Sequence, residues 1–289
     1  MESKELLKRV RKIELRTRKI TQQIFSGQYH SAFKGRGMTF SEVREYQYGD
    51  DIRNIDWNVT ARFNHPYIKV FEEERELTVM LLIDVSRSNQ FGTRERFKSD
   101  LITELSAVLA FSAISNNDKV GVIFFSNKVE KFIPPKKGRT HILRIIRELV
   151  NYEPLETETN ISEALRYLTN AIKKRCTTFL LSDFIDDQYE QAIRIASNKH
   201  DLVAIQVLDA GDRTLPEVGL ILVRDPETGA THYLDTSDKK ARESYHMWWQ
   251  TQYQKSIEQF KKSGVDHVQL YTDKDYVQSL TALFKRRGA

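Results

Sequence analysis

LTVMLLIDVSRS, the stretch at residues 77–88, decides the fold expected for this 289-residue chain. Its first seven residues are apolar except for Thr78, which is typical of a strand buried on both faces at the centre of a parallel sheet. Hydrophobic sequence ends at Asp84, and the oxygen-bearing side chains of Asp84, Ser86 and Ser88 occupy alternate positions. The carboxyl end of such a strand is where open α/β sheets bind ligands. A carboxylate and two hydroxyls suit Mg²⁺ better than Zn²⁺ or Cu²⁺.

From residue 77 onward, strand-like apolar runs alternate with helix-like segments, which predicts an open, mostly parallel α/β sheet with helices on both faces. Residues 126–128 are too few for a crossover, so the runs at 120–125 and 129–133 are expected to pair antiparallel. The other expected strands are residues 177–181, 202–208, 219–223, 231–234 and 266–271. The expected helices are residues 97–115, 141–150, 161–174, 188–199, 237–262 and 275–284.

Two further segments precede this sheet, so the chain is expected to divide into residues 1–26, 27–76 and 77–289. Residues 2–25 predict a helix, because mostly apolar residues recur at alternating spacings of four and three while the opposite face is basic. We favour a helix that packs on its own domain, and a docking helix for an acidic partner is the alternative. The recurring residues are Leu6, Val10, Ile13, Thr17, Ile20 and Ile24.

Residues 27–76 have the pattern of a small annex, with expected strands at 38–48 and 67–71 and one short helix between them. Ile52, Ile55 and Val59 recur at helical spacing and mark that helix. The annex also holds three aspartates with three arginines interleaved among them. Such a pattern favours a structural ion-pair network or a partner contact over a catalytic acidic cluster. These residues are Asp50, Asp51, Asp56, Arg44, Arg53 and Arg62.

Composition limits the class of protein. The net charge is +5, but residues 1–37 carry ten basic and three acidic residues, which leaves 35 basic and 37 acidic residues in the remainder. The basic excess therefore belongs to the amino-terminal segment, and nucleic-acid binding by the main domain is not expected. Cys176 is the single cysteine and is expected in the core, which favours a reducing compartment. The start of the chain lacks an apolar signal sequence and no run could span a bilayer, so we expect a cytoplasmic protein.

The candidate site combines residues from three loops: Asp84, Ser86 and Ser88, then Thr159 before an expected helix, and Asp183 after an expected strand. Parallel strands bring their carboxyl ends to one edge, so these five oxygen-bearing side chains are expected to converge around one divalent cation. Each residue alone has a simpler explanation, because Ser and Thr commonly cap helices and Asp commonly occupies turns. Their joint order favours the metal site.

These residues resemble a known family. The pattern of Asp84, Ser86, Ser88, Thr159 and Asp183 is similar to the metal-ion-dependent adhesion site (MIDAS) of von Willebrand factor A domains. The annex resembles the signature block of the bacterial family known as domain of unknown function 58, or DUF58. The segments that carry this second resemblance are GRGMTF at 35–40, REY at 44–46, GDDIR at 49–53, IDW at 55–57 and AR at 61–62.

The resemblance implies a von Willebrand factor A-like fold and a Mg²⁺ site, with Mn²⁺ or Ca²⁺ as alternatives, that binds an Asp or Glu of a partner protein. It also implies a MoxR-type AAA+ ATPase as partner, in protein complex assembly or maturation. No enzymatic activity is expected, because the sequence has no Gly-x-Ser-x-Gly motif and no Walker-type glycine loop. One alternative is a Mg²⁺-dependent hydrolase of phosphate compounds. That chemistry needs Lys or Arg beside the ion, and the loops at Ser86 and Thr159 offer only Arg87 and acidic residues. The other alternative is nucleic-acid binding through residues 1–37.

Overall fold

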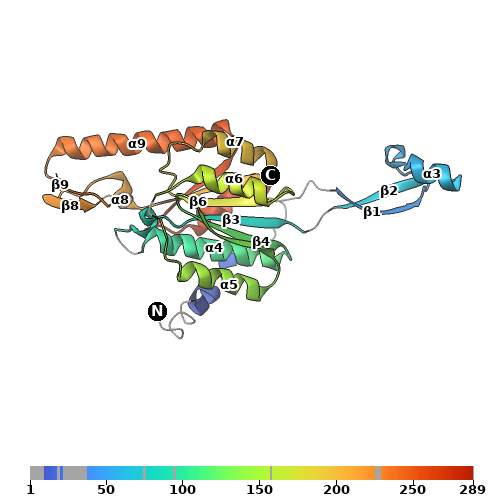
Figure 1. Cartoon of the computed structure of the whole chain (residues 1–289), viewed down its shortest axis with the longest axis horizontal. Helices are drawn as coiled ribbons and strands as arrows, with labels where there is room; N and C mark the ends of the chain where they lie inside the picture. The colour runs from blue at the N-terminus through green and yellow to red at the C-terminus, as the bar shows by residue number, and fades with distance from the viewer. Residues whose placement is uncertain are drawn as a thin grey trace. The chain divides into compact units, whose positions relative to one another are not determined.

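The computed structural model describes residues 10–17, 20–21, 38–73, 76–93, 96–156, 158–224 and 229–288 (Figure 1). The chain divides into two compact units. The smaller is Lys34–Leu77, against an expected annex of residues 27–76, and the larger combines Met1–Phe33 with Thr78–Ala289. Within the described ranges, no helix combines the length and the apolar character needed to cross a membrane.

The smaller unit is built on a two-stranded antiparallel sheet. The predicted single helix between the strands is wrong, because Ile55 leaves the helical path and forms a β-bridge with Ile68. Asp56 then begins a second helix, since its side chain accepts hydrogen bonds from two backbone N–H groups of the first turn. The same carboxylate lies 3.4 Å from Nζ of Lys69. The elements are β1 Met38–Glu45, the 3₁₀ helix η1 Ile52–Asn54, α3 Trp57–Phe63 and β2 Tyr67–Glu73.

Two aspartates of the smaller unit, Asp50 and Asp51, are paired with neighbouring arginines. Arg44 donates two hydrogen bonds to the carboxylate of Asp50, at 2.9 and 2.8 Å, and these bonds are the main cause of the lowered pKa of Asp50. Asp51 caps η1 and pairs with Arg53 at 3.0 Å. Arg62 has no ion pair with any residue that the structure describes. The expected ion-pair network therefore forms in part.

The larger unit contains a six-stranded sheet in the order β10-β7-β6-β3-β4-β5. All neighbouring strands are parallel except β4 and β5, which form the expected antiparallel hairpin. The predicted α/β fold with a mostly parallel sheet is confirmed. The strands are β3 Thr78–Asp84, β4 Lys119–Phe125, β5 Val129–Lys136, β6 Thr177–Ser182, β7 Asp201–Leu208 and β10 Asp266–Tyr271.

Helices cover both faces of this sheet. In Figure 1, α6, α7 and α9 lie on one side, and α4 and α5 lie on the other. A separate hairpin, β8 with β9, stands outside the main sheet. The predicted helix over residues 161–174 ends earlier, because Ile172 takes an extended conformation. The helices and outer strands are η2 Arg87–Gln90, α4 Lys98–Ser115, α5 Arg139–Val150, α6 Ile161–Ala171, α7 Glu190–Lys199, α8 Ala210–Arg213, β8 Leu220–Arg224, β9 Thr231–Asp235, α9 Lys239–Lys262 and α10 Val277–Gly288.

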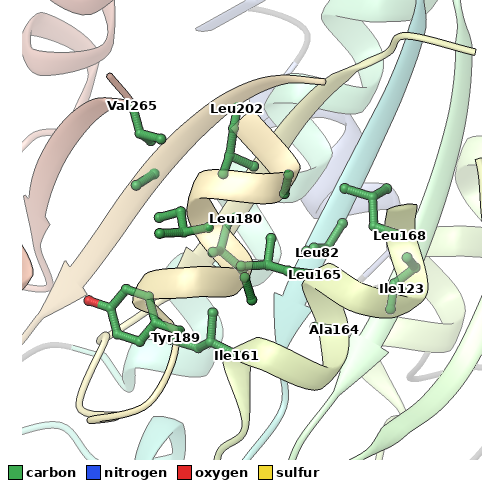
Figure 2. Packing of buried hydrophobic residues seen from close by; sticks show 14 of the residues in the cluster. Leu82, Ile123, Ile161, Ala164, Leu165, Leu168, Leu180, Tyr189, Leu202 and Val265 are labelled. Carbon is green, nitrogen blue, oxygen red and sulfur yellow. The ribbon is translucent and has the colours of Figure 1, made fainter. Parts of the chain in front are cut away.

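The core lies between the sheet and its helices. Leu82 and Leu180 come from neighbouring strands and pack in one buried cluster with Leu165 of α6 (Figure 2). Truncating such a side chain to alanine typically costs about 2–5 kcal/mol of stability. Cys176 belongs to the same cluster, as expected, and burial raises the pKa of its thiol to about 11. The central strand is thus held rigidly, which fixes the position of the residues at its end.

The described part of the amino-terminal segment, residues 10–17, is helical and packs on the larger unit. Nε of Arg139 in α5 donates to the buried Glu14 at 2.7 Å. Arg16 pairs with Glu104 of α4 at 2.9 Å. These contacts support the favoured interpretation, a helix packed on its own domain. Residues 20–21 are also helical, and the rest of the predicted helix lies outside the described residues.

Candidate metal-binding site

The candidate site lies where the strand order of the main sheet reverses. The chain runs outward from β3 to β4 and β5 and then returns to β6 on the other side of β3. Asp84 is the last residue of β3, and Asp183 directly follows β6. The two strands are parallel with Ile83 opposite Leu181, so both carboxylates leave the sheet at the same edge. Such a switch point is where open α/β sheets bind ligands.

The carboxylate of Asp84 is held by hydrogen bonds on both oxygens. Oδ1 accepts from the backbone N–H of Ser86 at 2.9 Å, and Oδ2 accepts from the hydroxyl of Ser182 at 2.6 Å. Asp84 and Ser86 are buried, while Ser88 is half-buried. The orientation of the Asp84 carboxylate is therefore set before any ligand arrives.

Ser88 connects the ends of the two strands. Its hydroxyl oxygen lies 3.0 Å from that of Ser86, and its side chain is close enough to the carboxylate of Asp183 to help lower the pKa of that group. Asp84, Ser86, Ser88 and Asp183 thus form one contiguous group, drawn from two loops. The structure brings together four of the five residues predicted from the sequence.

Thr159 lies on a third loop at the same edge of the sheet. The backbone N–H of Asn160 donates to the carbonyl of Ser126, beyond the end of β4, at 2.8 Å. The backbone N–H of Ile161 donates to Asp186, in the loop after β6, at 2.8 Å. Thr159 is therefore placed between the ends of the two strands that flank β3. In the described residues, it makes no direct hydrogen bond to the other four.

A buried lysine contacts one member of this group, Asp183. Lys98 is the first residue of α4 and its side chain is 2% exposed. Its Nζ lies 2.9 Å from Oδ2 of Asp183 and 3.5 Å from Oδ1 of Asp212, in α8. The expectation that the loops at Ser86 and Thr159 offer only Arg87 and acidic residues did not consider the helix that follows, and Lys98 lies in the first turn of that helix.

The pKa values reflect this pairing. Burial alone would raise the pKa of Asp183, but the charge of Lys98 and its hydrogen bond outweigh burial, so the pKa is lowered. Burial would lower the pKa of Lys98, but the charges of Asp183 and Asp212 raise it. Burial, with the charge of Asp183, raises the pKa of Asp84 to about 6.

One feature of the sequence could have revealed Lys98. Lys98, Leu101 and Leu105 are spaced by three and four residues, so they lie on one face of α4, and both leucines are fully buried. A lysine on the buried stripe of a predicted helix requires a carboxylate partner in the core. The partner of Lys98 could not be identified from the sequence, because Asp183 lies 85 residues away in the chain.

The buried charges at this edge are unbalanced. Asp84, Asp183 and Asp212 are three buried carboxylates, and Lys98 is the one cation that pairs with any of them among the described residues. When all four groups are ionised, three negative charges and one positive charge leave a net charge of −2. Uncompensated buried charge is costly, and a divalent cation would neutralise it.

The donor atoms suit a hard cation. Adjacent ligands of an octahedral Mg²⁺ with bonds of about 2.1 Å lie about 3 Å apart, and the hydroxyl oxygens of Ser86 and Ser88 are 3.0 Å apart. Over the described ranges, no group of three or more His, Cys, Asp or Glu side chains is arranged to hold a metal ion. A cation at this edge would therefore depend on the serine hydroxyls, as the predicted set requires.

The loop that carries the group borders a cavity of about 480 Å³. Asp84 and Ser86 contribute to its lining, together with Arg16 of the amino-terminal helix and Glu104 of α4. The cavity lies beside Asp84 and Ser86, between the amino-terminal helix and α4.

A fourth buried aspartate, Asp209, stabilises the loops around the site. It follows β7, and its carboxylate accepts hydrogen bonds from the hydroxyls of Thr93 and Thr272 and from the backbone N–H of Gly211 at 2.8 Å. These contacts tie the loop between η2 and α4 to the ends of β7 and β10. No motif in the sequence indicated this role, because Thr93 and Thr272 lie far from Asp209 in the chain.

Comparison with known proteins identifies the family. The family model described as "Protein of unknown function DUF58" matches residues 42–255. The chain belongs to the DUF58 family. One curated relative is the uncharacterised protein Rv1480 of Mycobacterium tuberculosis, 27% identical over 285 residues, which cover 97% of this chain and 90% of that protein. A second is the uncharacterised protein YeaD of Bacillus subtilis, 30% identical over 112 residues, which cover 38% of this chain and 25% of YeaD.

Solved structures match the fold of this DUF58 protein. The hypothetical protein BatB from Bacteroides thetaiotaomicron is 14% identical, with a TM-score of 0.50 over 73% of this chain and 98% of that chain. An aerotolerance-related membrane protein from Bacteroides fragilis, crystallised with multiple mutations to serine, is 16% identical with the same TM-score and coverage. The von Willebrand factor A (VWA) domain of SpRpn10 is a further neighbour, at 10% identity and a TM-score of 0.40 over 73% of this chain and 95% of that chain. At these identities the likeness concerns the fold alone.

Proposed function

We propose that this DUF58 protein is a non-enzymatic protein-binding module that recognises an Asp or Glu of a partner through a divalent cation, Mg²⁺ in the first place. The cation would be held by Asp84, Ser86, Ser88, Thr159 and Asp183. One observation carries the proposal: four of these oxygen-bearing side chains form a contiguous group at the switch point of the sheet, where the buried carboxylates outnumber the buried ammonium.

The residues have different roles in this scheme. The hydroxyls of Ser86 and Ser88 lie close enough together to bind one ion. Asp84 keeps its orientation because Ser182 and the backbone of Ser86 hold both of its oxygens. When bound, Mg²⁺ supplies a centre of positive charge for an incoming carboxylate. Neutral hydroxyls leave more of that charge uncompensated than carboxylate ligands would, which favours an acidic group from outside.

The proposed partner is a MoxR-type AAA+ ATPase, in protein complex assembly or maturation, and the proposed location is the cytoplasm. The partner rests on the resemblance of residues 35–62 to the signature block of the family. The proposed location is supported by the state of Cys176. This cysteine is buried, and its sulfur lies 3.2 Å from Nδ1 of His200. A buried free thiol fits a reducing compartment.

The test uses the purified chain and the MoxR-type ATPase of the same host. Immobilised wild-type protein should retain the ATPase in Mg²⁺, release it in EDTA and retain it again when Mg²⁺ is restored. The Asp84→Ala variant should not retain it. The matched control is Asp187→Asn, which removes an exposed carboxylate from the neighbouring loop and should bind normally. Equal retention by Asp84→Ala in EDTA would contradict the proposal.

A hydrolase of phosphate compounds gains one supporting observation, the position of Lys98. However, this ammonium is 2% exposed and already contacts two carboxylates, so it is not free to clamp a phosphate from solvent. Hydrolysis of bis(p-nitrophenyl) phosphate with Mg²⁺ or Mn²⁺ distinguishes the two functions. Turnover that disappears in Asp183→Ala would favour the hydrolase.

A further inference from the structure

The position of Lys98 has consequences for how the candidate site handles a metal ion. Its ammonium contacts Asp183, a predicted metal ligand, at 2.9 Å, and Asp212 at 3.5 Å. Asp212 is not one of the predicted ligands; it also accepts a hydrogen bond from the backbone N–H of Asp209 at 2.7 Å, within the capping box of α8. Lys98 therefore connects the site to α8 by an ion-pair bridge that needs no metal.

Lys98 cannot leave this position easily. A lysine with 2% exposure that loses its carboxylate contacts would remain as an unpaired charge in the core. Its aliphatic chain starts from the buried face of α4, and its ammonium also lies 5.8 Å from the centre of the Phe91 ring. The ammonium thus stays in place beside any ion bound by Ser86, Ser88 and Asp183, and the two positive charges repel each other.

We propose that Lys98 is a built-in cation that sets the metal affinity of the site. In the absence of a divalent ion, Lys98 compensates part of the negative charge of Asp183 and Asp212, which allows the domain to fold without metal. In its presence, the lysine charge weakens binding and keeps the ion exchangeable. This inference rests on the proposed function, because it assumes that the site binds a divalent ion.

The experiment measures Mn²⁺ binding to the full chain by electron paramagnetic resonance, and thermal unfolding in EDTA and in Mn²⁺. Lys98→Met removes the charge and keeps a long apolar chain. Asp212→Asn removes one carboxylate and keeps an oxygen that can accept the bond from Asp209. The double variant restores the wild-type net charge. Lys131→Met is the matched control, because it removes a half-exposed lysine that pairs with Glu148.

Lys98→Met should bind Mn²⁺ at least about tenfold more tightly than wild type, because a positive charge a few ångströms from the ion is removed. It should unfold at a lower temperature in EDTA and recover in Mn²⁺, whereas wild type should unfold at the same temperature in EDTA as without it. Asp212→Asn should bind Mn²⁺ more weakly than wild type. The double variant should return toward the wild-type affinity, and Lys131→Met should match wild type throughout.

Three results would overturn the inference: Mn²⁺ affinity unchanged or lowered in Lys98→Met, a double variant that does not move back toward wild type, or wild-type protein that unfolds in EDTA. If Lys98→Met does not fold even in Mn²⁺, the inference is tested by comparing the Mn²⁺ affinities of Asp212→Asn and wild type. Equal affinities in those two proteins would overturn the inference. If the protein binds Mn²⁺ normally but does not retain the ATPase, the proposed function is contradicted and the inference about Lys98 still stands. If none of the proteins binds Mn²⁺, both the proposed function and the inference about Lys98 are contradicted.

Discussion

The chain holds two groups of three aspartates that have opposite environments. In the smaller unit, Asp50 and Asp51 lie at the surface, and each pairs with an arginine within six residues in the sequence. In the larger unit, Asp84, Asp183 and Asp212 are buried and lie at or beyond the ends of three different strands, and one lysine, Lys98, pairs with Asp183 and Asp212.

The contrast shows what makes an acidic cluster a candidate site. The three carboxylates of the smaller unit are satisfied by arginines, by Lys69 and by backbone N–H groups, so they stabilise turns and helix starts. Three carboxylates brought together by the sheet have too few cations around them, and burial makes the excess charge costly. Burial and charge balance, rather than the number of aspartates, therefore distinguish the two groups.

The largest expected effect concerns metal binding. Asp84→Ala should abolish the binding of Mn²⁺ at the carboxyl edge, because it removes a buried carboxylate whose orientation is fixed by two hydrogen bonds. Asp50→Ala, its counterpart in the exposed group, should leave Mn²⁺ binding unchanged. Isothermal titration calorimetry of both variants checks the pair. Equal loss in the two variants would show that the buried group is not the binding site.

The next effect concerns stability in EDTA. Asp183→Ala should lower the free energy of unfolding by about 3–5 kcal/mol, because it leaves the ammonium of Lys98 buried with one distant partner. Asp51→Ala should have a much smaller effect, since its partner Arg53 is already in water. Urea unfolding followed by circular dichroism measures both values. A loss below about 1 kcal/mol in Asp183→Ala would mean that the ion pair is not buried in solution.

A smaller effect is expected from pH, with opposite signs in the two groups. The pKa of Asp84 is raised to about 6, so the metal-free folded protein holds a proton that the unfolded chain has lost. Its contribution to stability should fall as the pH rises from about 4 to about 6, by at most about 3 kcal/mol, and then stay constant.

Asp50 has a lowered pKa, chiefly because of the hydrogen bonds from Arg44, so its contribution is present at neutral pH and is lost as the pH falls below the ordinary range for Asp. Carbon-13 NMR titration of the aspartate carboxyl groups in EDTA resolves the two residues. An Asp84 carboxyl that titrates below 4 would remove the distinction between the groups.

The smallest effect is expected for Arg53→Ala. The side chain of Arg53 is 86% exposed, and its pair with Asp51 is formed in water, where solvent screens the charges. Neither urea unfolding nor Mn²⁺ binding should change measurably. A clear loss of stability would show that the exposed group supports the fold more strongly than its exposure indicates.

The main sheet could be predicted because its strands are buried on both faces and its helices alternate with them. Each strand is therefore a short apolar run that ends at a polar residue, as at Asp84 and Asp183. The single helix predicted in the annex is wrong because Ile55 pairs with Ile68, and that contact depends on a strand that follows later in the chain. The side-chain pattern around Ile55 is equally compatible with a helix and with a bridge.

The sequence by itself determined the family, the α/β class and four oxygen-bearing residues at the ends of neighbouring strands, because local hydrophobic pattern and parallel pairing together place strand ends at one edge. Only the tertiary structure decided that Lys98 joins them, since its partners lie 85 and 114 residues away in the chain. An ion pair of this kind depends on burial and on distance in space, and neither quantity is written in the local order of residues. Tertiary packing, and not the motif, therefore sets the charge balance of the site.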